Sequence, residues 1–214
     1  MWKIELNPGQ QLFFTSDTHY NHANICRGVT KWTGDIEKYT RPFTTLEQMN
    51  YVIVDEINFV VKEDDILIHL GDWSLGGFDS IREFRKKIHC KNIYLVLGNH
   101  DYHIEANKDN IRELFIDVAH YTKLELTKGL DTHKFVLCHY PICSWEGMNK
   151  GVMHLFGHVH LPPERKIMKG KSMDVGVDGN YMAPQNAHFI VNLLGNRPNA
   201  TNVIASDHHE VEIR

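Results

Sequence analysis

The chain has 214 residues, of which 42% are hydrophobic and 23% charged, a length and composition typical of one globular domain. The low numbers of glycine (15) and proline (7) exclude a collagen-like or low-complexity chain. No apolar run approaches the roughly 18 residues that a transmembrane helix needs. The formal net charge of −4 indicates no nucleic-acid or acidic-membrane partner, although bound metal ions would change the local sign. We therefore expect a single domain over residues 1–214 and no membrane association.

The chain up to residue 117 predicts strands that alternate with helices. Near-continuously apolar runs predict buried strands at 12–15, 66–70 and 93–97. A helix is predicted over 44–61, where Thr44 with Glu47, or Thr45 with Gln48, forms a capping box before an apolar stripe. A second helix is predicted from a cap at Ser80 to Ile88, and a third over 107–115. The β-α-β-α-β order is typical of a mixed or parallel sheet in an α/β protein.

Beyond residue 117 the pattern changes to strands joined by short turns. Strands are predicted at 135–138 and 153–156 and near 172–177, 187–194 and 202–213. A second sheet packed on the first is the simplest way to bury so many strands.

Each predicted strand leads directly into polar residues of a few types. The segments that follow them read SDTH at 16–19, GD at 71–72, GNHD at 98–101, CHYP at 138–141 and GHVH at 157–160. Ligands of open α/β sheets bind beyond the carboxyl ends of the strands, so these loops predict a site at one rim. The chain also contains 15 histidines, roughly three times average usage, and histidine is the commonest metal ligand.

The side chains at this rim form a set of nitrogen and oxygen donors without thiolates. Such a set suits Mn, Fe, Zn, Co or Ni, and its size favours two ions that share a bridging carboxylate over one tetrahedral ion. Two divalent cations would leave the site net positive and attract a phosphate. The candidate ligands are Asp17, His19, Asp72, Asn99, His139, His158 and His160.

These motifs resemble the calcineurin-like metallophosphoesterases. The family pattern D-x-H, G-D, G-N-H-[DE], H and G-H-x-H occurs here in the same order, and the resemblance covers residues 12 to 160. A small bacterial and bacteriophage subgroup opens with F-T-S-D-T-H-x-x-H-x-N-I, which is similar to residues 14–25. The resemblance implies an α/β sandwich of two packed mixed β-sheets flanked by helices, in four αββα layers.

The resemblance also implies a role for each motif residue. The first metal ion would be bound by Asp17, His19 and His160. The second would be bound by Asn99, His139 and His158, and Asp72 would bridge the two ions. His100 would stabilise the phosphate or protonate the leaving oxygen, with Asp101 holding its ring.

The activity implied is hydrolysis of a phosphate ester by a metal-bridged hydroxide, with Mn²⁺ as the first expectation and Fe, Ni, Zn or Co as alternatives. We expect a phosphodiesterase that acts on nucleotides, cyclic nucleotides or nucleic-acid ends. Phosphomonoester or pyrophosphate cleavage is the alternative within the same chemistry. A non-catalytic metal-binding scaffold is a more distant alternative, which the complete ligand set disfavours. The absence of a basic groove disfavours a long nucleic acid, and the oligomeric state stays open.

Residues 20–43 form a polar insertion that lengthens the interval between the first two motifs. We interpret it as a lid or a substrate-selecting wall. The candidate substrate contacts are His22, Asn24, Arg27 and Trp145. Each has a simpler alternative: a surface turn for the first two, a solvated arginine for Arg27 and core packing for Trp145.

The four cysteines contain no C-x-x-C pair and are expected to be free thiols in a reducing compartment. The first ten residues carry charges and a proline where a signal peptide would need an apolar run. We expect a cytoplasmic protein of bacterial or bacteriophage origin.

Overall fold

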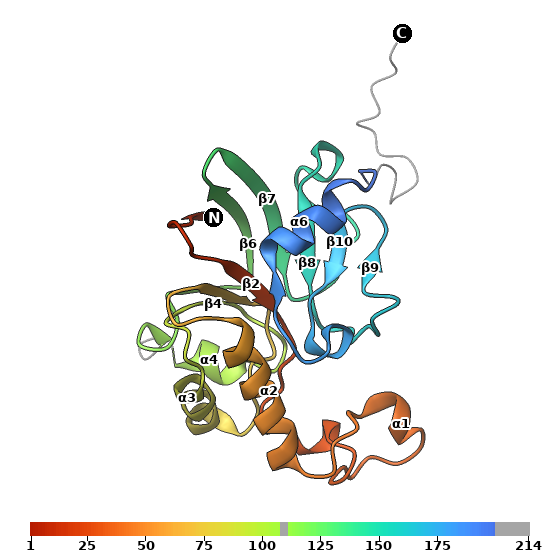
Figure 1. The fold of residues 1–214 in the computed structure, drawn as a ribbon. Helices are drawn as coiled ribbons and strands as arrows, with labels where there is room; N and C mark the ends of the chain where they lie inside the picture. The colour runs from red at the N-terminus through yellow and green to blue at the C-terminus, as the bar shows by residue number, and fades with distance from the viewer. Residues whose placement is uncertain (108–110, 200–214) are drawn as a thin grey trace.

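Two β-sheets pack face to face in this computed structural model, which describes residues 1–107 and 111–199 (Figure 1). The five-stranded sheet has the order β11-β2-β3-β4-β5. Its strands are β11 Gln185–Asn186, β2 Leu12–Thr15, β3 Ile66–His69, β4 Asn92–Val96 and β5 Asp117–Ala119. The six-stranded sheet has the order β1-β6-β7-β8-β10-β9. Its strands are β1 Trp2–Glu5, β6 Tyr121–Lys128, β7 Asp131–Cys138, β8 Met153–Phe156, β10 Ser172–Asp174 and β9 Ile167–Met168.

The strand directions place the carboxyl ends of several strands at one rim. Strands β2, β3, β4 and β5 are parallel neighbours, and only β11 runs antiparallel to this group. In the other sheet β7 and β8 are also parallel. The predicted fold class, two packed mixed β-sheets flanked by helices, is confirmed.

Alternate side chains of β2 enter two separate cores. Leu12 and Phe14 lie in the core between the sheets, where the Phe14 ring is 5.4 Å from that of Phe135. Phe13 points to the opposite face and joins the core under α2 (Leu46–Val60) and α3 (Gly77–Lys87). A strand buried on both faces has no need of polar alternation, which explains its continuously apolar sequence.

The predicted helix at 44–61 is confirmed as α2. The Thr45 hydroxyl accepts a hydrogen bond from the Gln48 backbone N–H at 3.1 Å, and the Gln48 side chain accepts one from the Thr44 N–H. The apolar stripe of α2 buries Met49, Ile53 and Ile57. Of the two predicted capping boxes, the structure therefore forms the one made by Thr45 and Gln48.

Two other helices differ from their predicted bounds. Helix α3 begins at Gly77, so Ser80 lies inside the helix, where its hydroxyl accepts a hydrogen bond from the Asn21 side chain rather than capping the end. A short helix α4 spans Tyr102–Ala106, before the helix predicted at 107–115, and residues 108–110 of that prediction lie outside the described residues.

The strand predicted at 187–194 is wrong, because this segment is helix α6 (Ala187–Gly195). The Asn186 side chain caps it by accepting a hydrogen bond from the His188 N–H at 2.9 Å. Ala187, Ile190 and Leu194 recur at helical spacing and enter the core between the sheets. Strands β1, β5, β6, β9 and β11 were not predicted, and the strand predicted at 202–213 lies outside the described residues.

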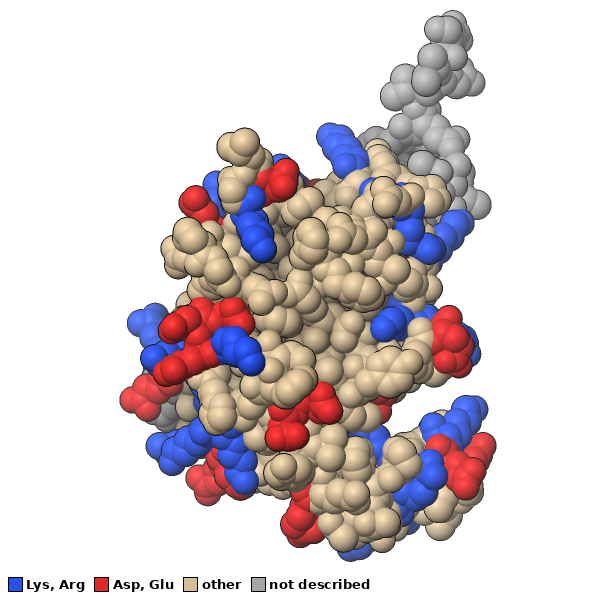
Figure 2. Space-filling model, viewed as in Figure 1, with Lys and Arg blue, Asp and Glu red and all other residues tan. Residues whose placement is uncertain are grey.

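The polar insertion at 20–43 leaves the end of β2 and extends away from both sheets, carrying η1 (Ala23–Ile25) and α1 (Ile36–Tyr39) (Figure 1). A backbone bridge between Cys26 and Arg41 brings its two ends together. Acidic and basic side chains are interspersed over the face of the molecule in Figure 2. Within the described residues, no helix combines the length and apolar character needed to span a bilayer.

Candidate metal centre

The candidate ligands lie on loops that follow β2, β3, β4, β7 and β8. Backbone hydrogen bonds join these loops. The N–H groups of Asp17 and His19 donate to the carbonyls of Gly71 and Asp72, and the N–H of Gly157 donates to the His139 carbonyl. These bonds join the loop after β2 to the loop after β3, and the loop after β7 to the loop after β8.

Five of the candidate ligands adopt a left-handed backbone conformation, which is rare for residues other than glycine. Their φ angles are 55° at Asp17, 49° at His19, 57° at Asp72, 72° at His158 and 48° at His160. Each such residue costs on the order of 1–3 kcal/mol and persists only where its surroundings enforce it. Backbone strain is thus concentrated at the rim.

Two glycines of the rim are required by close approach rather than by an unusual φ. A Cβ at Gly98 would overlap the Asp72 carboxylate, and a Cβ at Gly157 would overlap that of Asp17. Gly71 does have a left-handed conformation, with φ of 100°.

The first ligand group contains Asp17, His19 and His160, whose candidate ligand atoms all lie within 4.8 Å of one another. The Nε2 atoms of the two histidines are 3.2 Å apart, and the His160 Nε2 is 3.8 Å from Asp17 Oδ1. Asp17 is completely buried and His19 is nearly so.

The second ligand group contains Asp72, His139 and His158, again with ligand atoms within 4.8 Å. The Asn99 Oδ1 atom lies 3.1 Å from His139 Nε2 and 2.9 Å from His158 Nδ1. Asp72 Oδ2 also faces the first group, since it lies 3.5 Å from His19 Nε2 and 3.4 Å from His139 Nε2.

In two histidines of the rim, Nδ1 makes a hydrogen bond and Nε2 is left available to a cation. His139 Nδ1 donates to the Leu70 carbonyl at 2.8 Å, and His160 Nδ1 donates to the Asp178 carboxylate at 2.6 Å. In its neutral form, each ring then presents an unprotonated Nε2 to the centre, as metal-binding imidazoles do. The donor set and its convergence fit two divalent cations.

Burial and mutual interaction perturb the ionisable groups of the rim. Burial raises the pKa of the Asp17 carboxyl to about 7, so a neighbouring cation would strongly favour its ionised form. Burial lowers the pKa of His19 well below its ordinary value, with Arg41 adding to the effect. For Asp72, burial is outweighed by the His139 hydrogen bond and the His19 charge, which hold its pKa below the usual range.

His100 and Asp101 play different parts in the backbone of the rim. The His100 N–H donates to Asp72 Oδ1 at 2.9 Å, and the His100 ring lies 5.3 Å from that of His19. The buried Asp101 carboxylate accepts hydrogen bonds from the N–H groups of Gly98, Asp72 and Trp73 at 2.8–2.9 Å. The structure thus engages Asp101 in joining two rim loops, whereas the sequence predicted that it would hold the His100 ring.

The four predicted substrate contacts lie in different places. The His22 ring is close to the site, 5.2 Å from that of His19 and 6.0 Å from that of His100. Asn24 accepts a hydrogen bond from the Lys31 N–H within the insertion. Arg27 donates to the Thr40 hydroxyl and to the Glu37 and Thr40 carbonyls. Trp145 is buried, with its Nε1 bonded to the Val152 carbonyl and its ring 5.2 Å from that of His154. Of the four, His22 is the one that the structure brings into contact with the rim.

Sequence reasoning missed two residues beside the first ligand group. Asp178, which follows β10, accepts the hydrogen bond from His160. Arg41, interpreted as part of a polar loop, is 2% exposed and pairs with Asp178 at 2.8 Å. Neither residue belongs to a spaced motif, so no local signal pointed to them.

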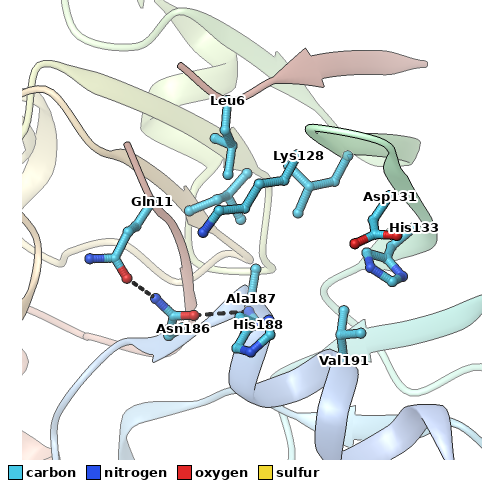
Figure 3. A pocket seen from close by; sticks show the side chains of 11 residues that line it. Leu6, Gln11, Lys128, Asp131, His133, Asn186, Ala187, His188 and Val191 are labelled. Atoms are coloured by element: carbon cyan, nitrogen blue, oxygen red, sulfur yellow. Dashed lines mark hydrogen bonds between the residues drawn. The ribbon is translucent and has the colours of Figure 1, made fainter. Parts of the chain in front are cut away.

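A separate cavity of about 340 Å³ opens near the amino-terminal ends of β2 and α6 (Figure 3). Leu6, Leu12 and Val191 contribute apolar surface, while Lys128 and His133 line it with polar groups. Since the ligand groups follow the carboxyl end of β2, this cavity lies at the other end of that strand.

Comparisons with known proteins agree with the fold and the motifs. The family model of calcineurin-like phosphoesterases matches residues 11–210. An uncharacterized protein of Methanocaldococcus jannaschii is 28% identical over 190 residues, which cover 86% of this chain and 92% of that protein. The crystal structure of a protein of unknown function from Aquifex aeolicus shares the fold, with a TM-score of 0.62 and 24% identity over 86% of this chain and 100% of that one. An archaeal phosphodiesterase gives a TM-score of 0.45 and 18% identity over 78% of this chain and 82% of its own, a likeness too weak to carry an argument.

Proposed function

Because the chain belongs to the calcineurin-like phosphoesterase family, we propose that it is a two-metal hydrolase of phosphate esters that prefers phosphodiesters. The observation that supports this best is the convergence of two ligand groups on Asp72, which lies within 3.5 Å of a histidine from each. We propose Mn²⁺ as the cation, with Fe, Ni, Zn or Co as alternatives.

When bound, two such cations would neutralise phosphate charge and lower the pKa of coordinated water. The protein residues then have distinct tasks. Asp17, His19 and His160 would hold one cation, and His139, His158 and Asn99 the other. Asp72 would serve both, since its Oδ1 accepts the His100 N–H and leaves Oδ2 between the groups.

His100 is the proposed catalytic side chain of the rim. Its ring lies beside His19, at the edge of the first ligand group, and is partly exposed. There it would donate a hydrogen bond to a phosphoryl oxygen or a proton to the departing oxygen.

His22 is the proposed substrate contact from the insertion. Its Nδ1 is buried without a hydrogen-bond partner among the described residues, and burial together with His100 lowers its pKa to about 4. A neutral imidazole would accept or donate a hydrogen bond to the substituent of the phosphate without adding charge. The Trp32 ring, 6.0 Å from that of His22 and 44% exposed, is placed to pack against a flat substituent such as a nucleobase.

The mixed surface charge supports a small substrate rather than a long nucleic acid. Acidic and basic side chains are interspersed over the face in Figure 2, and the formal net charge is −4. Nucleotides, cyclic nucleotides and nucleic-acid ends are therefore the proposed substrates.

A paired assay tests the proposal. Chelator-treated protein would be resupplied with Mn²⁺, Ni²⁺ or Zn²⁺ and given bis-p-nitrophenyl phosphate or p-nitrophenyl phosphate. We expect metal-dependent diesterase activity that falls by roughly 100-fold or more in His100→Ala, the usual contribution of a general acid. The matched control is His120→Ala, whose side chain is 69% exposed and bonded to Glu105. Preference for the monoester would favour a phosphatase, and bound metal without turnover of either substrate would favour the scaffold.

A further inference from the structure

Behind the first ligand group, two distant parts of the chain form an ion pair between Arg41, which is buried, and Asp178, which is partly buried. Arg41 lies near the end of the 20–43 insertion. Asp178 belongs to η3 (Val177–Asn180), which follows β10. The Arg41 Nε and Nη2 atoms each donate to one Asp178 oxygen at 2.8 Å, a bidentate arrangement. The same Asp178 Oδ2 atom accepts the His160 Nδ1–H at 2.6 Å.

The same guanidinium also holds the backbone of the D-x-H motif. Its Nη2 donates to the Asp17 carbonyl at 2.6 Å and its Nη1 to the Thr18 carbonyl at 2.9 Å. These carbonyls lie within the segment in which Asp17 and His19 both have positive φ. One buried side chain therefore supports a strained turn and the carboxylate behind His160 together.

We propose that Arg41 and Asp178 are positioning residues of the first ligand group, which fix the ring of His160 and the backbone of Asp17 and His19 for cation binding. The inference rests on the proposed two-metal function. It assigns the 20–43 insertion a task beyond that of a lid, because the end of the insertion supplies Arg41. A carboxylate behind a ligating imidazole fixes its tautomer and orientation, and loss of such a partner costs roughly 10- to 100-fold in metal affinity.

The effect should be confined to one ligand group, which makes it measurable without turnover. In a His158→Ala background the second group is incomplete, and in a His160→Ala background the first is. Mn²⁺ would be titrated into each metal-free protein by calorimetry. Asp178→Asn should weaken binding roughly 10- to 100-fold in the His158→Ala background and by less than threefold in the His160→Ala background.

Two further variants separate positioning from folding. Asp178→Asn leaves the Arg41 charge buried without its carboxylate and should lower the thermal midpoint. The double variant Arg41→Gln/Asp178→Asn removes both charges, so its thermal midpoint should recover while its Mn²⁺ affinity stays low. The matched control is Asp65→Asn, since Asp65 is a buried carboxylate that accepts hydrogen bonds from backbone N–H groups and is in neither ligand group.

A measurement on the unmodified sequence covers the case in which the variants fail to fold. Nitrogen-15 spectra of the Zn²⁺-loaded protein should show His160 as the Nδ1–H tautomer, with the signal assigned by its absence in His160→Ala. An Nε2–H tautomer, or Mn²⁺ affinity unchanged within twofold by a folded Asp178→Asn, would overturn the proposal. If Asp178→Asn weakens binding but the unmodified protein hydrolyses no phosphate ester, the positioning role stands and the proposed function fails.

Discussion

The two ligand groups of the rim share donor chemistry but differ in what lies behind them. In the first group, His160 donates to Asp178, a carboxylate held by a buried guanidinium. In the second group, His139 donates to a backbone carbonyl, that of Leu70, and His158 is exposed. The difference teaches that equal donor types do not imply equal affinity, because an anionic partner makes an imidazole more basic and holds its ring. We expect the first group to bind its cation more tightly.

The largest effect is expected from a substitution that impairs both ligand groups at once. Asp72 lies between the groups, so Asp72→Ala should impair both. We expect phosphodiester hydrolysis to fall about a thousandfold, which corresponds to about 4 kcal/mol of transition-state stabilisation. Bound metal should drop from two ions to one or none, measured by elemental analysis after dialysis. Asp64→Ala, in an exposed turn, is the control. Retention of both ions would contradict the bridging role of Asp72.

The next effect distinguishes the two groups. His158→Ala should leave one tightly bound Mn²⁺ in the first group, whereas His160→Ala should leave one weakly bound Mn²⁺ in the second. We expect the two remaining dissociation constants to differ by roughly tenfold or more. Among the described residues, His160 Nδ1 has a carboxylate partner, whereas His139 Nδ1 has a backbone carbonyl. Equilibrium dialysis of both variants measures the two constants. The opposite order of affinities would contradict this expectation. It would show that the free energy of desolvating the buried first group exceeds the stabilisation that Asp178 provides.

The last prediction concerns His154, a buried histidine outside both groups, whose titration contributes to the pH dependence of stability. His154 donates from Nδ1 to the Val136 carbonyl and accepts from the Ile142 N–H at Nε2. Burial lowers its pKa from 6.5 to about 4. The folded state therefore favours the neutral ring, and its stabilisation is complete above pH 6.5 and lost as the pH falls toward 4. The loss amounts to about 3 kcal/mol at most.

Urea unfolding of metal-free protein between pH 7 and pH 4 tests this contribution. His154→Gln should flatten the fall in unfolding free energy over this range relative to the unmodified protein. The exposed His120→Ala should not change it. An unchanged slope in His154→Gln would assign the acid sensitivity to other groups, such as His69, whose pKa burial lowers to about 3.

Prediction from the sequence succeeded where the signal is local. The strands before each motif are short apolar runs, and α2 carries its own cap at Thr45. Prediction failed at 187–194, where β-branched and aromatic residues resemble a strand, yet the Asn186 cap and helical spacing of Ala187, Ile190 and Leu194 form α6. The apolar residues of a short segment fit both periods, and packing between the sheets decides which one forms.

The sequence by itself determined which residue types follow each strand, and so the composition of the rim and the family of the chain. The tertiary structure alone decided how those residues are held. The left-handed turns at Asp17 and His19, the three N–H groups gathered by Asp101 and the pairing of Arg41 with Asp178 join segments far apart in the chain. A ligand motif is a local pattern, whereas the support behind a ligand is a contact across the fold, which spacing along the chain does not encode.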